Sequence, residues 1–401
     1  MRRMQRVICG VLGLAMLLLA PIGAAARAAT PVPTPDNDPF YVPPSNLATT
    51  TPGTILRARA VNVAALGLPL PFRSWQLLYR STDSHGAPEA TVATVLEPES
   101  AAPPGGRPLL AYQPAEDALT RSCAPSYEMR QGTEPEELEM VLPLLKDWAI
   151  VVADYEGPQS QWAAGAQAAH GVLDAIRAAE AFAPAGLRGA ATSVGLWGYS
   201  GGGQATGWVA ELAPGYAPEL NIKGAAYGGA PADVGRTFRY LDGGAFAGIA
   251  FAGAVGLSRA YPEMDLQSLL NAKGRAMAAQ VGTECIDQFA FQYPYARISD
   301  YTSVPDPLAV PRVKQVVTMD NLGQRKPTTP LYIYNATHDE LNPIAAGDAL
   351  VSHYCSEGVT VDYERILVGE HISPVVTNAA QAVSYLADRF AGKPAPSTCP
   401  G

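Results

Sequence analysis

The chain has 401 residues, of which 48% are hydrophobic and 16% are charged. This composition is typical of a folded globular protein and excludes a largely disordered one. The formal net charge of −9 at pH 7 argues against a protein that binds nucleic acids or anionic membranes by charge attraction. A chain of this length can form one large core with a substantial insertion.

The first 28 residues have the pattern of a secretory signal peptide. Three arginines precede an apolar run at residues 7–20, and the small-x-small sequence Ala26-Arg27-Ala28 follows it. The run of about 14 residues is shorter than the roughly 20 that a membrane-spanning helix needs. We therefore expect cleavage near Ala28 and a secreted, extracellular protein without a transmembrane anchor. Cleavage removes four of the 28 basic residues and leaves 24 against 37 acidic ones, a net charge near −13.

The next segment, residues 29–231, predicts the first part of a mixed sheet. An extended, proline-rich leader at 30–54 comes first. Two segments with period-two alternation, 74–79 and 90–96, predict an antiparallel strand pair joined by a turn. From residue 108 on, strands alternate with helices, which is the pattern of a mostly parallel sheet with helices on both faces. These strands are expected at 108–113, 148–153, 193–197 and 222–227, with helices at 134–146, at 161–182 and after 202 through 212.

Residues 232–312 break this alternation. They contain apolar helical segments at 245–257 and 266–281 and no clear strand pattern. We predict a helical cap, or lid, inserted into the sheet domain; ordinary helices with long loops are the alternative. The sheet resumes at 313–401, with strands at 329–335 and 361–367 and a closing helix at 379–390.

Ser200 lies in the sequence Gly-Tyr-Ser-Gly-Gly at 198–202, between the predicted strand 193–197 and a predicted helix. A serine on a sharp strand-to-helix turn, with glycines two residues away on either side, is typical of the nucleophile elbow of α/β-hydrolases. Glycines are needed there because strand and helix leave no room for a Cβ. The pattern also arises by chance in a chain with 38 glycines, so the strand–turn–helix context carries the argument.

A serine hydroxyl becomes a good nucleophile when a histidine accepts its proton and a carboxylate orients that histidine. In this fold the acid and then the histidine follow the serine in the chain, on loops after later strands. Asp339 follows the strand at 329–335, and His371 follows the strand at 361–367. We therefore expect the triad Ser200–Asp339–His371.

Other acids and histidines compete for these roles. Glu340 is adjacent to Asp339, and Asp348 lies inside a predicted helix, whereas Asp339 directly follows a strand. Asp154 ends an earlier strand and is expected to be structural. The remaining histidines lie in a turn, in helices or directly before the acid, and we assign them no catalytic role: His85, His170, His338 and His353.

The oxyanion hole needs hydrogen-bond donors next to the nucleophile. The backbone N–H of Gly201, directly after the serine, is the expected first donor. The second should come from the loop after the strand at 108–113. Asp117 is the leading candidate there, because a protonated carboxylic acid in an apolar pocket donates a hydrogen bond. The alternatives are that Asp117 contributes only its amide, or that it is an uninvolved surface residue.

Export leaves four cysteines: Cys123, Cys285, Cys355 and Cys399. An even number in an oxidising compartment predicts two disulfides, and four cysteines allow three pairings. No histidine lies at ligand spacing from another histidine or a cysteine, so we expect no metal site. We expect no cofactor either.

Several short segments stand out together: Ser122–Tyr127, the elbow Gly198–Gly203, Tyr216–Ile222, Asp339–Pro343 followed by Cys355, and Gly369–His371. With these segments the chain resembles the secretory lipase family over residues 35–399. The resemblance implies an α/β-hydrolase fold with a helical cap. It implies that Ser200, Asp339 and His371 form the triad and that Gly201 and Asp117 form the oxyanion pair. It further implies the disulfides Cys123–Cys285 and Cys355–Cys399.

The sequence therefore predicts a secreted serine hydrolase that cleaves carboxylic esters, foremost triacylglycerols, through an acyl-enzyme intermediate. We expect a monomer whose partner is a lipid or ester substrate, met at a lipid–water interface. An esterase or acyltransferase for shorter-chain, phenolic or polyester substrates is the alternative, because these enzymes share the acyl-enzyme step. A fungal family member continues past its last cysteine into a flap near the active site, whereas this chain stops at Gly401. The difference argues against interfacial activation by such a flap and keeps esterase activity on shorter acyl chains open. A catalytically silent lipid-binding protein is a third possibility.

Overall fold

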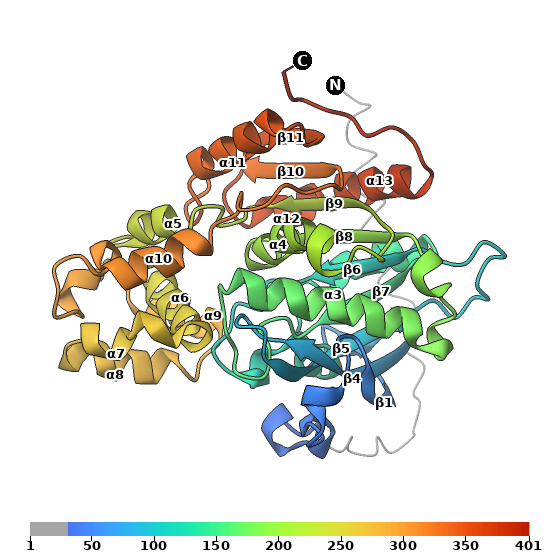
Figure 1. The fold of residues 1–401 in the computed structure, drawn as a ribbon, viewed down its shortest axis with the longest axis horizontal. Coiled ribbons are helices and arrows are strands. Elements are labelled where there is room, and N and C mark those ends of the chain that lie inside the picture. The colour runs from blue at the N-terminus through green and yellow to red at the C-terminus, as the bar shows by residue number, and fades with distance from the viewer. Residues whose placement is uncertain (1–30, 401) are drawn as a thin grey trace, which may run out of the picture. The chain divides into compact units, whose positions relative to one another are not determined.

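The centre of the molecule is a nine-stranded sheet with the order β1-β4-β5-β7-β6-β8-β9-β10-β11 (Figure 1). The computed structural model describes residues 31–400, so the predicted signal peptide at 1–28 lies outside the described residues. Neighbouring strands from β1 to β7 pair antiparallel, and those from β7 to β11 pair parallel. The predicted mostly parallel sheet with an antiparallel start is confirmed.

The predicted strands lie close to their predicted positions, but three further strands, β1, β2 and β3, were not predicted. β1 was not predicted, because its alternation of arginine with alanine gives only a weak apolar pattern, and as an edge strand it has no buried side chain. The strands are β1 Ile55–Val61, β2 Ala64–Ala65, β3 Leu68–Pro69, β4 Arg73–Thr82, β5 Pro88–Glu97, β6 Leu109–Gln113, β7 Ala149–Ala153, β8 Val194–Tyr199, β9 Ile222–Gly228, β10 Leu331–Ala336 and β11 Val361–Ile366. β2 and β3 form a separate hairpin.

Two predicted helices are interrupted. The segment 134–146 forms only a 3-10 turn, Glu137–Met140, followed by the short helix α2. The segment 266–281 is divided into α7 and α8, because the side chain of Asn271 caps the start of α8. The helices are α1 Pro125–Gln131, α2 Val141–Leu145, α3 Gly165–Ala181, α4 Gly201–Tyr216, α5 Val234–Leu241, α6 Ala247–Ala260, α7 Leu266–Leu269, α8 Ala272–Val281, α9 Ile286–Gln292, α10 Pro311–Met319, α11 Ile344–Ser356, α12 Ser373–Thr377 and α13 Ala379–Phe390. Within residues 31–400, none of them combines the length and the apolar composition of a membrane-crossing segment.

Helices cover both faces of the sheet. Side chains of α3, α4 and α11 form one buried cluster with the strands, and side chains of α1, α2 and α13 form a second cluster on the opposite face. Because both faces are buried, β6, β7, β8 and β10 consist entirely of buried residues. The sheet therefore holds its strand ends, and the loops that follow them, in fixed positions.

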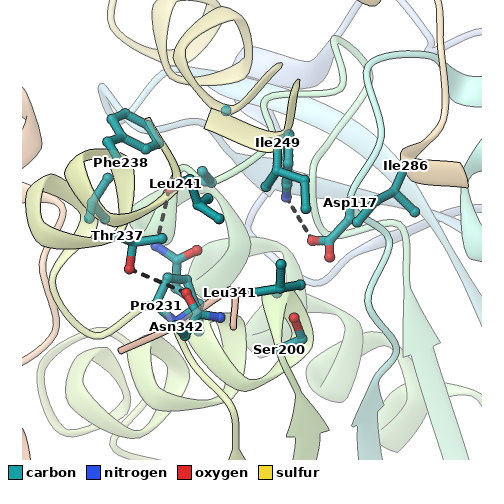
Figure 2. Close-up of a pocket in the computed structure, with 16 residues that line it drawn as sticks. Asp117, Ser200, Pro231, Thr237, Phe238, Leu241, Ile249, Ile286, Leu341 and Asn342 are labelled. Carbon is teal, nitrogen blue, oxygen red and sulfur yellow. Dashed lines mark hydrogen bonds between the residues drawn. The ribbon is translucent and has the colours of Figure 1, made fainter. Parts of the chain in front are cut away.

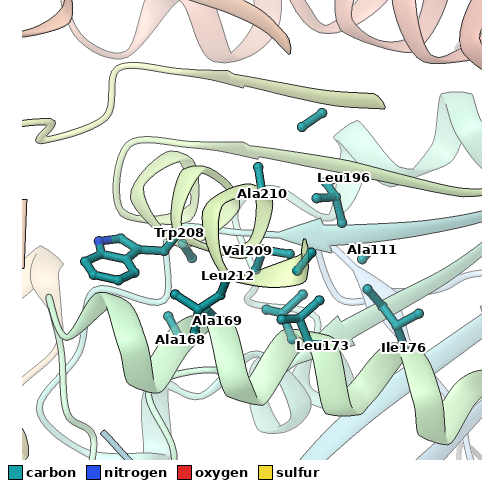
Figure 3. Close-up of a cluster of buried hydrophobic side chains, with 14 of the residues drawn as sticks. Ala111, Ala168, Ala169, Leu173, Ile176, Leu196, Trp208, Val209, Ala210 and Leu212 are labelled. Carbon is teal, nitrogen blue, oxygen red and sulfur yellow. The ribbon is translucent and has the colours of Figure 1, made fainter. Parts of the chain in front are cut away.

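The helix that follows the elbow packs closely on its neighbour. Ala168 and Ala169 of α3 lie beside Val209 and Leu212 of α4, in a cluster that also includes the sheet residue Leu196 (Figure 3). All five side chains are buried. Alanine side chains let the two helices and the sheet approach closely without a cavity.

The chain between β9 and β10 forms helices α5 to α10 and, in the described residues, no strand. These helices lie to one side of the sheet (Figure 1) and have apolar clusters of their own. One cluster includes Leu119 and Trp162 from the sheet domain, which pack with Phe251 and Phe289 of α6 and α9. The segment agrees in position with the predicted cap at 232–312, although α10 continues past it; its role as a separate domain stays a prediction.

Two disulfides fix loops of the molecule. Cys123 is bonded to Cys285, with a Cα–Cα distance of 6.0 Å, and joins the loop after β6 to the start of α9. Cys355 is bonded to Cys399, with a Cα–Cα distance of 5.4 Å, and joins α11 to the C-terminal segment. These are the pairings that the family resemblance implied.

Candidate active site

Ser200 forms a sharp turn between β8 and α4. Its backbone has φ 56° and ψ −120°, a left-handed conformation that costs free energy for any residue with a Cβ. Two glycines make the turn possible. A Cβ on Gly198 would lie 2.3 Å from the carbonyl oxygen of Gly202, and a Cβ on Gly202 would lie 1.9 Å from the carbonyl oxygen of Gln113. The strand and the helix therefore touch where the motif has no side chain.

The structure brings Ser200, His371 and Asp339 together. Ser200 Oγ lies 2.7 Å from His371 Nε2, and His371 Nδ1 lies 2.8 Å from Asp339 Oδ2. The side chains of His371 and Asp339 are each only 1% exposed. Asp339 Oδ1 accepts hydrogen bonds from the backbone N–H groups of Leu341 and Asn342, which fix the carboxylate in the loop after β10. This is the geometry of a nucleophile, a base and an orienting acid.

The competing acids lie elsewhere or contact the histidine differently. Glu340 Oε2 accepts a hydrogen bond from the backbone N–H of His371 at 3.0 Å, so it holds the loop and not the imidazole ring. Asp348 accepts a hydrogen bond from the hydroxyl of Tyr363. Asp154 is buried and accepts hydrogen bonds from the backbone and side chain of Ser126.

The other histidines make contacts away from the nucleophile. Three of them lie within hydrogen-bond distance of backbone oxygens through one ring nitrogen: His85 with Ala260, His170 with Asp83 and His353 with Gly323. His338 is exposed on the loop after β10. Of the five histidines, His371 is the one at hydrogen-bond distance from Ser200 within the described chain.

Tyr199 is a site residue that the sequence did not reveal. Its hydroxyl donates a hydrogen bond of 2.7 Å to the backbone carbonyl of His371, and the two rings lie 5.3 Å apart. The residue before the nucleophile thus holds the loop that carries the histidine. The only signal in the sequence was its place inside the elbow motif, which says nothing about a partner more than 170 residues away.

Asp117 lies against the elbow from the loop after β6. A Cβ added to Gly201 would lie 1.8 Å from Asp117 Oδ1, so the carboxyl occupies the space that a side chain at Gly201 would need. Burial raises the pKa of Asp117 to about 6, although the hydrogen bond from Trp162 and the nearby His371 act in the opposite direction. The backbone N–H of Asp117 donates no hydrogen bond to any other described residue. Gly201 is the first residue of α4, where backbone N–H groups have no acceptor within the helix.

The loop that carries Asp117 is braced by buried polar groups. The backbone N–H of Ala115 donates to Glu136, that of Glu116 donates to the hydroxyl of Tyr155, and that of Ala118 donates to Glu156. Burial raises the pKa of Glu136 to about 7 and holds those of Glu116 and Glu156 well above their usual range. Ala118 also pairs with Cys285, next to the disulfide. The loop is therefore fixed along its length.

A cavity of about 570 Å³ opens at Ser200 (Figure 2). Its polar end is formed by Asp117, Ser200 and Gly201, and its other walls are mostly apolar. The walls come from the cap helices and from the loop after β10: Val234, Phe238, Leu241, Ile249, Gly253, Ile286 and Leu341. A second cavity of about 540 Å³ lies within the cap, has an almost wholly apolar lining and shares Phe238 with the first.

A family model described as secretory lipase matches residues 129–398. The chain belongs to the secretory lipase family. It is 38% identical to lipase A of Arthroderma benhamiae over 391 aligned residues, which cover 90% of this chain and 81% of that protein. It is 40% identical to a Mycobacterium tuberculosis protein named as a probable inactive lipase, over 90% of this chain and 83% of that protein. The crystal structure of Candida antarctica lipase A superposes with a TM-score of 0.85 at 30% identity, over 92% of this chain and 89% of that one.

Membership of this family confirms the α/β-hydrolase fold that the elbow motif indicated. The family match extends across the cap and the loops that carry Asp339 and His371. Two disulfides in one chain, in a family described as secretory, agree with an oxidising compartment.

Proposed function

We propose that this protein is a secreted serine hydrolase that cleaves carboxylic esters, with acylglycerols as the leading substrate class. The observation that carries the proposal is the hydrogen-bonded chain from Ser200 Oγ through His371 to Asp339, at one end of a largely apolar cavity. An apolar cavity with a few polar groups at one end suits a substrate with a long acyl chain and one reacting carbonyl. Relatives named as lipases support this substrate class.

In the first half-reaction, Ser200 Oγ attacks the ester carbonyl carbon, and its proton passes to His371 Nε2. Asp339 stabilises the imidazolium through its hydrogen bond with Nδ1. The oxyanion that forms is stabilised by the N–H of Gly201 and by Asp117. His371 then gives the proton to the leaving alcohol oxygen as the C–O bond breaks, which leaves the acyl group on Ser200.

In the second half-reaction, water attacks the acyl-enzyme. His371 Nε2 accepts a proton from the water, the tetrahedral intermediate collapses, and Ser200 Oγ recovers the proton as the free acid leaves.

The Ser200→Ala variant tests the proposal. It should lose nearly all hydrolysis of p-nitrophenyl esters, at least about 10³-fold in kcat/KM, because no nucleophile remains. Its far-UV circular dichroism and melting temperature should match those of the wild type. The matched control is Ser352→Ala on the exposed face of α11, which should leave the rate unchanged. Retained activity in Ser200→Ala would refute the triad assignment.

Rates on esters of increasing chain length separate a lipase from the alternatives. Activity that persists on long-chain, water-insoluble triacylglycerols supports a lipase. Activity confined to short or phenolic esters, or transfer of the acyl group to added alcohols in preference to water, supports an esterase or an acyltransferase. The second cavity has an apolar lining and shares Phe238 with the first, so a long acyl chain would gain further apolar space if the Phe238 side chain moved aside.

A catalytically silent lipid-binding protein is the second candidate, because one similar relative is named as a probable inactive lipase. A fluorophosphonate probe distinguishes the two, since it labels only an activated serine. Labelling of the wild type that is absent in Ser200→Ala supports the hydrolase. A wild-type protein that neither reacts with the probe nor hydrolyses any ester, yet binds fatty acids, would establish the silent alternative.

A further inference from the structure

The carboxyl group of Asp117 has one hydrogen-bond donor among the described side chains. The indole Nε1–H of Trp162 donates to Asp117 Oδ1 at 2.7 Å, and both residues are buried. The dashed line at Asp117 in Figure 2 marks this bond. The other oxygen, Oδ2, has no hydrogen-bond partner in residues 31–400, and Asp117 lines the cavity at Ser200.

Trp162 is held in place from behind by the cap. Its ring lies 5.2 Å from the ring of Phe289 in α9, at an angle of 32°. A Cβ on Gly256 of α6 would lie 2.5 Å from the backbone oxygen of Trp162, so helix and loop touch there. Arg259 of α6 also donates a hydrogen bond of 3.1 Å to the backbone oxygen of Ser160 in the same loop. The indole N–H is therefore fixed in space before substrate binds.

The hydrogen bond from the indole determines which oxygen of the Asp117 carboxyl accepts and which one can carry a proton. An indole nitrogen is only a donor, so the oxygen it contacts must act as an acceptor. A proton on the carboxyl then belongs on Oδ2. A neutral carboxyl held in this way is a free donor in the wall of the cavity at Ser200, and a developing oxyanion requires such a donor.

We infer that Trp162 is a positioning residue of the oxyanion hole, which holds Asp117 Oδ1 so that the protonated Oδ2 donates to the oxyanion of the ester. The inference rests on the proposed ester hydrolysis and adds a residue to it. No bond is made or broken at Trp162, and it does not touch the reacting atoms.

The surroundings of Asp117 favour the protonated, neutral form of its carboxyl group more than water does. Burial is the largest influence and raises its pKa to about 6; the bond from Trp162 and the charge of His371 lower it. None of the cap residues that line the cavity, Ile249 and Ile286 among them, carries a titratable group. The remaining titratable neighbours belong to the same loop, the loop after β7 and the segment before α2. Burial raises their pKa values, and the charge of Asp117 raises them further: Glu116, Tyr155, Glu156 and Glu136.

The Trp162→Phe variant removes the donor and keeps an aromatic ring against Phe289. We expect kcat on a soluble short-chain ester to fall at least about 10-fold with little change in KM, since an oxyanion donor is no longer oriented. The bond from Trp162 stabilises the ionised carboxyl, so its loss raises the pKa of Asp117. As the pH rises, Asp117 ionises and kcat declines. In Trp162→Phe this decline should occur at higher pH, and the maximal kcat should be lower. A merely structural tryptophan would not move this part of the pH profile.

Two further variants keep the inference testable if Trp162→Phe folds poorly. In Asp117→Asn, Trp162 should hold the amide oxygen and direct the NH₂ group to the oxyanion, so activity should stay within about 10-fold of the wild type and lose its dependence on ionisation near pH 6. In Asp117→Ala, adding Trp162→Phe should have no further effect. Trp148→Phe, a buried tryptophan packed on Phe390, is the matched control and should leave kcat unchanged.

The inference is refuted if Trp162→Phe lowers the rate equally with and without Asp117, or if the pH profile stays in place. It is also refuted if Asp117→Asn is as inactive as Asp117→Ala. A separate readout does not need turnover: the ¹³C chemical shift of the Asp117 carboxyl in the Ser200→Ala background should titrate at higher pH after Trp162→Phe. Failure of the wild type to hydrolyse any ester refutes the proposed function, whereas an unchanged carboxyl titration refutes the role of Trp162.

Discussion

The left-handed backbone of Ser200 is maintained by neighbours that cannot move. A positive φ on a residue with a Cβ costs about 1–3 kcal/mol and persists only when its surroundings enforce it. Here the enforcing contacts are backbone to backbone: Gly198 against Gly202, and Gly202 against Gln113. The oxygen of Gln113 belongs to the last residue of β6, so the elbow and the oxyanion loop share one tight contact.

The Gly202→Ala variant tests this contact. A Cβ at this position would meet the backbone oxygen of Gln113 at 1.9 Å, and relief would require moving either the end of β6 or the start of α4. We expect the free energy of unfolding to fall by about 3 kcal/mol, with loss of most activity. Urea denaturation and ester hydrolysis measure the two effects.

Gly215 near the end of the same helix is the control for this substitution. A Cβ there meets nothing within 4 Å, so Gly215→Ala should raise stability by about 0.5–1 kcal/mol through helix propensity and leave the rate unchanged. Equal losses in the two variants would show that alanine is disfavoured in α4 for a general reason and not at the elbow contact.

At the scale of elements, the disulfide between Cys123 and Cys285 ties the loop that carries Asp117 to the helices between β9 and β10. The adjacent backbone pairs, Ala118 with Cys285 and Leu119 with Glu284, continue the same connection. The second disulfide, Cys355–Cys399, joins the end of α11 to the C-terminal segment, and neither cysteine lines the cavity at Ser200. The two bonds should therefore affect catalysis differently.

The double variant Cys123→Ser/Cys285→Ser should lose both stability and kcat, because it frees the loop that carries Asp117. The stability loss should be about 2–5 kcal/mol, as for other native disulfides. The matched variant Cys355→Ser/Cys399→Ser should lose stability with kcat preserved at a temperature where it is folded. Melting temperatures and single-temperature kinetics distinguish the outcomes, and unchanged kcat in the first variant would contradict the coupling.

The sequence allowed prediction of the elements whose signals are local. The buried strands, the elbow at Ser200 and the order of Asp339 and His371 follow from periodicity and from the known order in this fold. β1 was missed because an edge strand needs no buried face. The helix expected at 266–281 is broken because the Asn271 side chain caps α8 and Leu270 pairs with Thr302, a partner more than 30 residues away.

Contacts between distant segments explain what the sequence could not reveal at the site. Tyr199 contacts His371 across the sheet edge, and Trp162 contacts Asp117 across 45 residues of chain. Neither residue belongs to a motif that specifies its partner. Such contacts can be recognised only from the three-dimensional structure, in which the strand order brings the two loops together.

At the scale of the whole molecule, buried carboxyl groups with raised pKa values are unusually numerous. Burial raises the pKa of Asp117 and Asp154 to about 6 and that of Glu89 and Glu136 to about 7. The folded protein therefore binds protons more tightly than the unfolded chain, whose carboxyls titrate near pH 4. The stabilising contribution of these groups is fully present below that pH and is lost as the pH rises through 6 and 7.

We expect the melting temperature to be several degrees higher at pH 5 than at pH 8, as measured by differential scanning calorimetry. The Glu89→Gln variant removes one of these groups and should reduce the difference. Glu99→Gln, at an exposed position after β5, should leave it unchanged. A melting temperature that rises steadily from pH 5 to pH 8 would contradict the assignment.

The close packing of α3 on α4 limits which amino-acid substitutions this protein can tolerate. Alanines at that contact fill their space, so a larger side chain there pushes on the helix that begins at the nucleophile. The cap is different, because it has its own apolar clusters and encloses cavities that side chains of another size can fill or enlarge. Laboratory evolution toward new esters should therefore accumulate its substitutions in the cap and leave the α3–α4 contact nearly untouched.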